Sequence, residues 1–107
     1  MLNEPIFFDC AVALARRTLE EAGRDDAARV SQAFRRVVSR APDGDERAAL
    51  LMLLKKQRQR YASGELDPAE LFPPGEPAPL GATTAEWAAM TVVSRAILNL
   101  DETITKE

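Results

Sequence analysis

The sequence predicts an all-α fold in which four helices form a bundle-like array, with a long proline-rich connection between the third and fourth helices. Apolar residues recur at helical spacing in four stretches, and helix-capping residues stand near the starts of these stretches. No stretch alternates with the two-residue period of a β-strand over more than a few residues. Residues 1–107 are therefore expected to form a single helical domain.

The first helix is expected over residues 3–22, with Asn3 as its cap and Gly23 in the left-handed position that follows its end. Its apolar side chains form two adjacent stripes, so the helix should contact two neighbours. One stripe holds Phe7, Ala11, Leu14 and Thr18, and the other holds Phe8, Val12, Ala15, Leu19 and Ala22. Cys10 is the only cysteine, which excludes an internal disulfide, and we expect it to be a small buried side chain rather than a reactive thiol.

The second helix is expected over residues 25–40, beginning at Asp25. Pro42 should stop it, because a residue that precedes proline is disfavoured in the helical conformation. Its inner face is expected to carry Val30, Phe34, Val37 and Val38.

The third helix, expected over residues 43–63, has the clearest start, because Asp43 and Glu46 stand three residues apart as in a capping box. Its first half contains five successive large apolar residues at positions 50–54, which extend over more than one turn. We therefore expect this section to be covered on nearly all sides. The second half, residues 55–60, is basic and polar, so the helix should pass from the centre of the protein to its surface.

Residues 64–82 hold five of the seven prolines, a density that no regular helix tolerates beyond a short turn near residues 68–71. This connection is either a mobile linker or an ordered strap held by its own apolar residues. The strap is favoured, because a linker has little use for large apolar side chains. Those side chains are Leu66, Leu71, Phe72 and Leu80.

The fourth helix is expected over residues 83–105, and Thr83 with Glu86 forms a second capping-box pattern at its start. Apolar side chains at helical spacing predict that it is the other core helix. They are Trp87, Met90, Val93, Ile97, Leu100 and Ile104.

The composition, with 46% apolar and 29% charged residues and a net charge of −3, is typical of a globular domain. There is no histidine, which excludes Ser-His-Asp and Cys-His nucleophilic systems, histidine-ligated zinc and haem attachment through CxxCH. No pair of carboxyl groups is marked by apolar surroundings that would shift its pKa. We therefore expect no enzyme activity and no resident metal or cofactor. Neither a membrane span nor an export signal is visible, and the localisation stays open.

Charge is unevenly distributed along the chain. Residues 1–34 carry a net charge of −2, residues 35–64 carry +5 and residues 65–107 carry −6. Seven cations form a basic zone at the C-terminal ends of the second and third helices, where they are favoured beside exposed carbonyl groups. They are Arg35, Arg36, Arg40, Lys55, Lys56, Arg58 and Arg60. We expect the basic zone to match the acidic C-terminal third within the chain, with binding to nucleic acid or another anion as the alternative. Trp87 suits either the core or an interface, and it joins the basic zone as the candidate interaction surface.

Three stretches carry a resemblance to a known family. They are Leu2-Asn3-Glu4-Pro5, then Phe34-Arg35-Arg36 followed by Arg40-Ala41-Pro42 and Glu46, and the closing Leu98-Asn99-Leu100-Asp101-Glu102. Together they resemble the C-terminal region of a bacterial family called domain of unknown function fifteen fifty-three, which is associated with planctomycete-type bacteria. The resemblance covers nearly the whole chain, and the closing segment is its most specific part.

The resemblance implies relatives that are long, multidomain, exported proteins, often with a c-type cytochrome-like domain near the N-terminus and with this helical region last. No haem ligand carries over, because the chain has no CxxCH. What the resemblance implies for this chain is therefore the C-terminal module of a larger protein of unknown activity. It also suggests that Met1 marks a cut in a longer chain.

We therefore expect a non-catalytic helical scaffold or interaction module. Its partner would be the remainder of the parent protein, another protein, or a second copy of the chain. The wide apolar faces of the first and third helices favour this hypothesis. The alternative is a nucleic-acid or anion-binding module that uses the basic zone, and a weaker third hypothesis is a small-molecule site beneath the proline-rich strap.

Overall fold

Four α-helices and one short 3-10 helix make up the fold in the computed structural model. It describes the backbone of residues 5–73 and 75–105 and the side chains of residues 8–73 and 75–101. The elements are α1 (Pro5–Glu21), α2 (Asp26–Val38), α3 (Gly44–Ala62), the 3-10 helix η1 (Pro68–Glu70) and α4 (Thr84–Thr105). No strand occurs in the described residues, so the predicted all-α class with four helices is confirmed. The predicted cap Asn3 lies outside the described residues.

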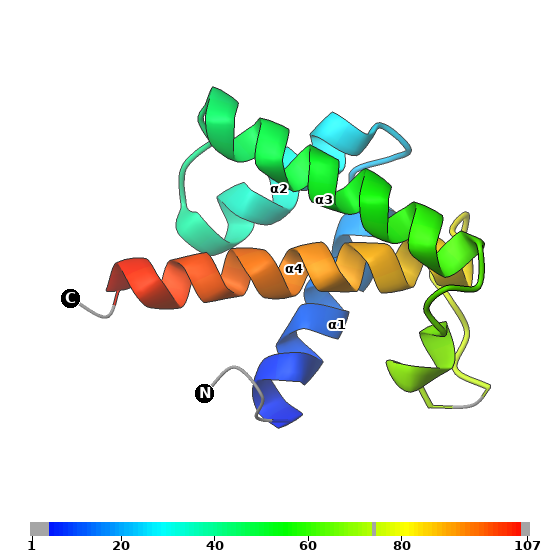
Figure 1. The fold of residues 1–107 in the computed structure, drawn as a ribbon. Helices are drawn as coiled ribbons and strands as arrows, with labels where there is room; N and C mark the ends of the chain where they lie inside the picture. Colours follow the sequence, from blue (N-terminus) through cyan, green and yellow to red (C-terminus); the bar gives the residue numbers. More distant parts are fainter. Residues whose placement is uncertain (1–4, 74, 106–107) are drawn as a thin grey trace.

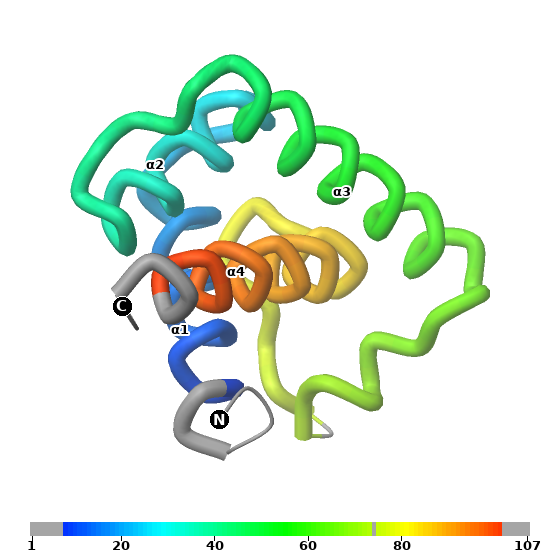
Figure 2. Tube along the Cα trace, turned by 60° about the vertical axis from the view of Figure 1, so that its left-hand side comes forward, coloured from blue at the N-terminus to red at the C-terminus, as the bar shows by residue number. Residues whose placement is uncertain are grey.

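Helix α4 lies across the middle of the molecule, and the other elements pack around it (Figure 1). It contacts α1, α2, α3 and η1, whereas α2 and α3 also contact each other. In Figure 2, where α4 runs nearly along the line of sight, the other helices and the connection that precedes α4 lie around its axis. None of the described helices combines the length and apolar character needed to cross a bilayer.

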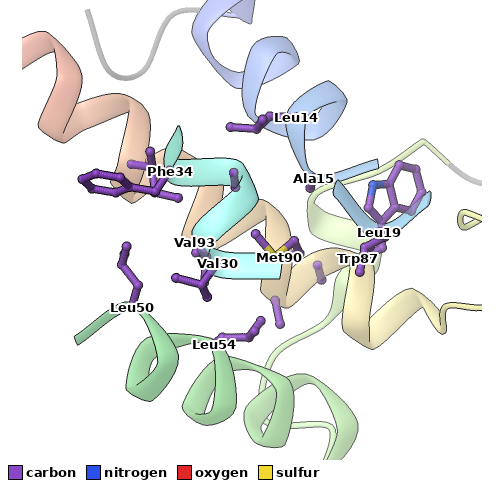
Figure 3. Packing of buried hydrophobic residues seen from close by; sticks show 14 of the residues in the cluster. Leu14, Ala15, Leu19, Val30, Phe34, Leu50, Leu54, Trp87, Met90 and Val93 are labelled. Atoms are coloured by element: carbon purple, nitrogen blue, oxygen red, sulfur yellow. The ribbon is translucent and has the colours of Figure 1, made fainter. Parts of the chain in front are cut away.

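The core is one cluster of buried side chains that α4 dominates. Figure 3 shows Met90 in the middle of the cluster, with Ala15 from α1, Val30 from α2 and Leu54 from α3 around it. The predicted inner face of α4 is confirmed for its first four members, which are fully or almost fully buried: Trp87, Met90, Val93 and Ile97. Leu100 is 41% exposed, and the side chain of Ile104 lies outside the described residues.

The starts and ends of the helices follow local sequence signals. At the start of α3, the Glu46 amide donates to the Asp43 carboxylate at 2.8 Å and the Asp43 amide donates to the Glu46 carboxylate at 2.9 Å, which is a complete capping box. At α4, the Glu86 amide donates to Thr83 Oγ1 at 3.0 Å, but the Glu86 carboxylate turns to another partner. Helix α2 stops at Val38, before the expected residue 40, because Ser39 adopts a left-handed conformation with φ of 68°.

Helix α3 is less covered than its apolar run suggested. Leu50 and Leu54 are buried, but Leu51 and Leu53 are only half-buried and Met52 is 71% exposed. The expectation that the run is covered on nearly all sides was therefore wrong. The reason is that α2 and α4 cover only one side of α3, so its outer face meets solvent.

Helix α1 buries one continuous face, formed from the middle of both predicted stripes: Ala11, Leu14, Ala15, Thr18 and Leu19. The side chain of Phe7 lies outside the described residues. Cys10 is exposed, which corrects the expectation of a buried thiol. It lies on the solvent side with Ala13 and Arg17, one helical turn and two turns further on.

The described part of residues 64–82 packs as a strap rather than a linker. Phe72 is buried and stacks on Trp87 with ring centroids 3.7 Å apart and planes 6° from parallel. Arg16 of α1 donates to the Pro77 carbonyl at 2.7 Å. Leu66 and Leu71 are half-buried, and the expected short turn is η1. Leu80 is 94% exposed, however, so it does not hold the strap as expected.

Candidate interaction surface

The basic zone is divided between two ends of the molecule, because α2 and α3 run in opposite directions. Arg40, just after the end of α2, forms two hydrogen bonds with Glu46 at the start of α3, at 2.8 and 2.9 Å. Arg58, near the end of α3, forms two with Asp26 at the start of α2, at 3.0 and 2.6 Å. The prediction of one zone was wrong, because it placed two helix C-termini together that the packing separates.

Four of the seven cations of the basic zone form ion pairs with carboxylates of the same chain. In addition to the two pairs above, Arg36 lies 2.8 Å from Glu21 and Arg60 lies 2.6 Å from Glu65. Three of the four carboxylates precede residue 65, so the expected match with the acidic C-terminal third was wrong in its partners. The internal match exists, but α1 and the first turns of α2 and α3 supply most of it.

Trp87 belongs to the core and not to a surface. Its side chain is 1% exposed, Phe72 stacks on its ring, and the Arg16 guanidinium lies 4.6 Å from the ring centroid. The core alternative for Trp87 is therefore correct, and Trp87 is removed from the candidate interaction surface. Its indole Nε1 is buried and has no hydrogen-bond partner among the described residues.

A hollow of about 610 Å³ opens between the α1–α2 turn, α2, α3 and the start of α4. Four cations line it: Arg24, Arg29, Lys55 and Arg58. Three carboxylates line it as well, those of Asp25, Asp26 and Glu86, together with Ala27, Leu51 and Gly81. The lining side chains thus carry a net charge of +1, in a chain whose net charge is −3. We call this hollow the charged cleft.

Arg29 forms the buried floor of the charged cleft. Its Nε donates to the Gly23 carbonyl at 2.8 Å and its Nη1 to Glu86 at 3.2 Å, while Asp26 lies 4.0 Å from Nη1. Arg29 is only 4% exposed, and the two carboxylates offset the cost of removing its positive charge from water. One buried guanidinium therefore connects the α1–α2 turn, α2 and α4.

The three carboxylates of the charged cleft are already engaged within the chain. The hydrogen bonds from Arg58 hold the pKa of Asp26 below its ordinary value, against the opposing effect of partial burial. Asp25 accepts from the Ala28 amide at 2.9 Å and caps α2, and Glu86 accepts from Arg29. The pKa of Asp26 is thus shifted away from the raised value that a general acid requires.

Two cations at the rim of the charged cleft remain without such engagement. Arg24 and Lys55 are both exposed, and neither forms an ion pair or side-chain hydrogen bond with another described residue. Arg24 lies close to the strap, since its Nη2 is 3.9 Å from the point where a Cβ on Gly81 would stand. Sequence reasoning found Lys55 as part of the basic zone but missed Arg24.

The exposed Leu80 sits beside the charged cleft. The Ala82 amide donates to the Pro79 carbonyl at 3.1 Å, and Gly81 has φ of 81°, so residues 79–82 form a tight turn with glycine at its third position. Pro79 is buried and anchors this turn, which presents Leu80 to solvent next to the lining residue Gly81. The Pro-Leu-Gly order is the signal that could have identified the turn from the sequence.

The other predicted cations lie elsewhere. Lys56 and Arg60 line a separate hollow of about 580 Å³ near the end of α3. A third hollow of about 360 Å³ lies against η1 and is lined largely by the strap's own residues, with Thr84 from α4. No group of three His, Cys, Asp or Glu side chains within the described part of the chain could hold a metal ion.

Comparisons with known proteins give no indication of function, so an inference about function has to be based on the geometry described above. No family model, no curated protein and no solved structure matches the chain. The resemblance to the C-terminal region of domain of unknown function fifteen fifty-three accordingly stays a prediction.

Proposed function

We propose that this chain is a non-catalytic helical scaffold that binds another protein, or another part of a larger parent protein, through the face that carries the charged cleft. The observation that supports it most is Leu80, a large apolar side chain held 94% exposed by a well-defined turn beside a concave charged surface. Exposing leucine in this way contributes nothing to the fold, whereas covering it with a partner removes apolar surface from water.

The chemistry of the charged cleft favours binding over catalysis. A catalytic carboxyl group needs a pKa near the working pH, and the pKa of Asp26 is lowered by Arg58 rather than raised. The ion pairs instead fix α2, α3 and α4 relative to one another, so the cleft presents a preformed surface. A preformed surface loses less conformational entropy when a partner binds.

The alternative function, binding of nucleic acid through the basic zone, has less support. Four of the seven cations are paired, and the antiparallel course of α2 and α3 separates Arg40 from Arg58. A phosphate backbone is bound by a continuous stripe of free cations, which these residues do not form within the described part of the chain.

Membership in a larger bacterial protein is the second part of the proposal, and the family resemblance supports it. The reading frame upstream of Met1 tests it directly. A coding sequence that continues in frame into further domains would support a C-terminal module, and a genuine ribosome-binding site with an isolated start codon would contradict it.

Exposed apolar surface tests the scaffold proposal on the protein itself. We expect the isolated chain to self-associate with rising concentration in multi-angle light scattering, or to bind a hydrophobic fluorescent dye while folded. Leu80→Ser should reduce either signal, whereas Thr84→Ser, an exposed position on the adjoining helix start, should not. A strict monomer that binds no dye would contradict the proposal.

A further inference from the structure

We propose that the charged cleft is a docking site for an acidic side chain of a partner protein, with an apolar residue next to that acid packing on Leu80. This inference rests on the proposed function and names the chemistry that its partner presents. Three features support it: the sign of the charge that the charged cleft can accept, the class of molecule that carries such a charge, and the apolar contact that Leu80 offers.

The charged cleft is suited to an anion and not to a cation. Each of its three carboxylates is held by an arginine or by a helix-start amide, so an incoming cation would have to displace bonds of 2.6 to 3.2 Å. An incoming carboxylate instead meets donors that are not already used, because Arg24 and Lys55 form no hydrogen bond or close ion pair with the described residues, and Lys55 interacts with Asp26 only at longer range. The hydrogen bonds of Arg29 to Gly23 and Glu86 use Nε and Nη1, so its Nη2 is a further donor that forms no hydrogen bond with another described residue.

A protein segment fits the charged cleft better than a nucleic acid does. The two rim cations come from different elements, Arg24 from the α1–α2 turn and Lys55 from α3, and they line one hollow together with three carboxylates. A single carboxylate can enter between the cations, whereas a chain of phosphates would place further negative charges beside Asp25 and Glu86. The net lining charge of +1 matches one carboxylate.

Leu80 specifies what lies next to the acid. It precedes the lining residue Gly81, and Leu51 of α3 also lines the hollow, as a half-buried apolar side chain. A partner residue with an apolar side chain beside its carboxylate would cover part of Leu80 while its carboxylate contacts Arg24 and Lys55. Burial of apolar surface would then supply affinity that exposed ion pairs alone supply poorly.

Three small probes separate these contributions in an amide chemical-shift titration of the full chain. N-acetyl-leucine carries one carboxylate beside one apolar side chain, N-acetyl-leucinamide lacks the carboxylate, and N-acetylglycine lacks the apolar side chain. We expect N-acetyl-leucine to shift the amides of Ala27, Lys55 and Gly81 with a dissociation constant on the order of millimolar, as suits a ligand of this size. The other two probes should bind at least about threefold more weakly.

Matched variants locate the binding. Lys55→Ala and Arg24→Ala should each weaken N-acetyl-leucine by about threefold or more, because each removes a free donor at the rim. Lys56→Ala is the control, since Lys56 is an equally exposed neighbour that lines the other hollow. Leu80→Ala should weaken N-acetyl-leucine but leave N-acetylglycine unchanged. All four positions are exposed, and circular dichroism would verify that each variant folds.

Several outcomes would overturn the inference. Equal binding of N-acetyl-leucinamide would exclude a role for the carboxylate, and an equal effect of Lys56→Ala would exclude the charged cleft as the site. Inorganic phosphate that binds more tightly than N-acetyl-leucine, with no effect of Leu80→Ala, would indicate a general anion site instead of a peptide site. If the probes fail while the chain still exposes apolar surface to dye, the docking site is refuted and the scaffold proposal stands. If the chain is a strict monomer without dye binding, the scaffold proposal fails whatever the probes do.

Discussion

Helix α3 contains five large apolar residues in succession at positions 50–54, whereas in the best-covered part of α4, residues 87–94, half of the residues are small. On α3 the middle of the run, Met52, is 71% exposed and its two neighbours are half-buried. On α4 seven of the eight residues are buried, and only Val92 is partly accessible. A run of large apolar residues therefore does not by itself indicate how fully a helix is covered.

The difference in burial between α3 and α4 comes from how closely neighbouring helices can approach each of them. Ala88, Ala89, Thr91 and Ser94 give α4 a slim surface, so that α1, α2 and α3 can all contact it. Five large side chains in a row point around more than a full turn, so a helix covered on one side must leave some of them in solvent. A central helix is thus marked by small residues between large ones.

Helices α3 and α4 also differ in the interactions that hold them in the fold. Helix α4 is held by apolar packing along its buried half and by one ion pair near its start, Arg29–Glu86, whereas α3 has an arginine–carboxylate pair with two hydrogen bonds near each of its ends. The pairs of α3 are Arg40–Glu46 and Arg58–Asp26.

The largest expected difference lies between two methionines, Met90 on α4 and Met52 on α3. Met90→Ala removes a fully buried side chain and should lower the free energy of unfolding by about 2–5 kcal/mol, because the lost burial and the resulting cavity both cost. Met52→Ala should change it by no more than about 0.5 kcal/mol. Urea unfolding followed by circular dichroism measures both, and similar losses at the two sites would contradict the central position of α4.

A smaller effect of the same kind is expected when an alanine is enlarged. Ala89→Leu places extra volume where α4 is fully covered and should cost about 1–3 kcal/mol. Ala49→Leu, on the exposed face of α3, should cost no more than about 0.5 kcal/mol. If Ala89→Leu were tolerated as well as Ala49→Leu, close approach of the helices would not be the reason for the small residues.

Features that depend on neighbours in sequence could be predicted, and features that depend on packing could not. The capping box of Asp43 and Glu46 lies within one turn, so its residues determine its hydrogen bonds directly. Two contacts join segments that are far apart in the chain: Phe72 stacks on Trp87, and Arg16 donates to the Pro77 carbonyl. No local sequence pattern predicts either contact. The helices and the strap were therefore predictable, but their contacts were not.

The grouping of the basic zone depended on packing as well. Arg40 and Arg58 both lie near a helix C-terminus, but the short connection between α2 and α3 makes these helices antiparallel, so the two C-termini lie at opposite ends of the pair. Lys55 was identified because it belongs to a run of cations, whereas Arg24 stands alone in a turn and becomes relevant only when the strap places Gly81 beside it. A site assembled from a helix, a turn and a strap has no signature in any one of them.

Acid should weaken the Arg40–Glu46 ion pair at the start of α3 more than it weakens the apolar packing of α4. Glu46 has a pKa of about 2, lowered from an ordinary 4.5 mainly by its hydrogen bonds with Arg40 and then by the Asp43 amide. A lowered pKa in the folded state stabilises the fold above the ordinary value, and this stabilisation is lost as the pH falls from about 4.5 towards 2. The advantage of the wild type over Glu46→Gln should therefore shrink across this window in urea unfolding.

The partner residue provides the control for this pH dependence. Arg40→Gln removes the main cause of the lowered pKa, so it should reduce the acid sensitivity that the Glu46 pair contributes. A difference between wild type and Glu46→Gln that stays constant from pH 5 to pH 2 would show that the pair does not stabilise α3. High salt should diminish the effect, because the pair is exposed.

The smallest expected effect concerns two hydroxyl groups in the buried half of α4. Thr91 Oγ1 donates to the Trp87 carbonyl at 2.7 Å, whereas the buried Ser94 Oγ has no hydrogen-bond partner among the described residues. Ser94→Ala removes an unsatisfied polar atom and introduces a better helix former, so it should raise the free energy of unfolding by about 1 kcal/mol. Thr91→Val removes a satisfied hydroxyl and should lower it by about the same amount. Urea unfolding of the two variants should thus give changes of opposite sign, and a loss of stability in Ser94→Ala would mean that Ser94 has a partner in solution, such as a buried water, that holds this part of α4 in place.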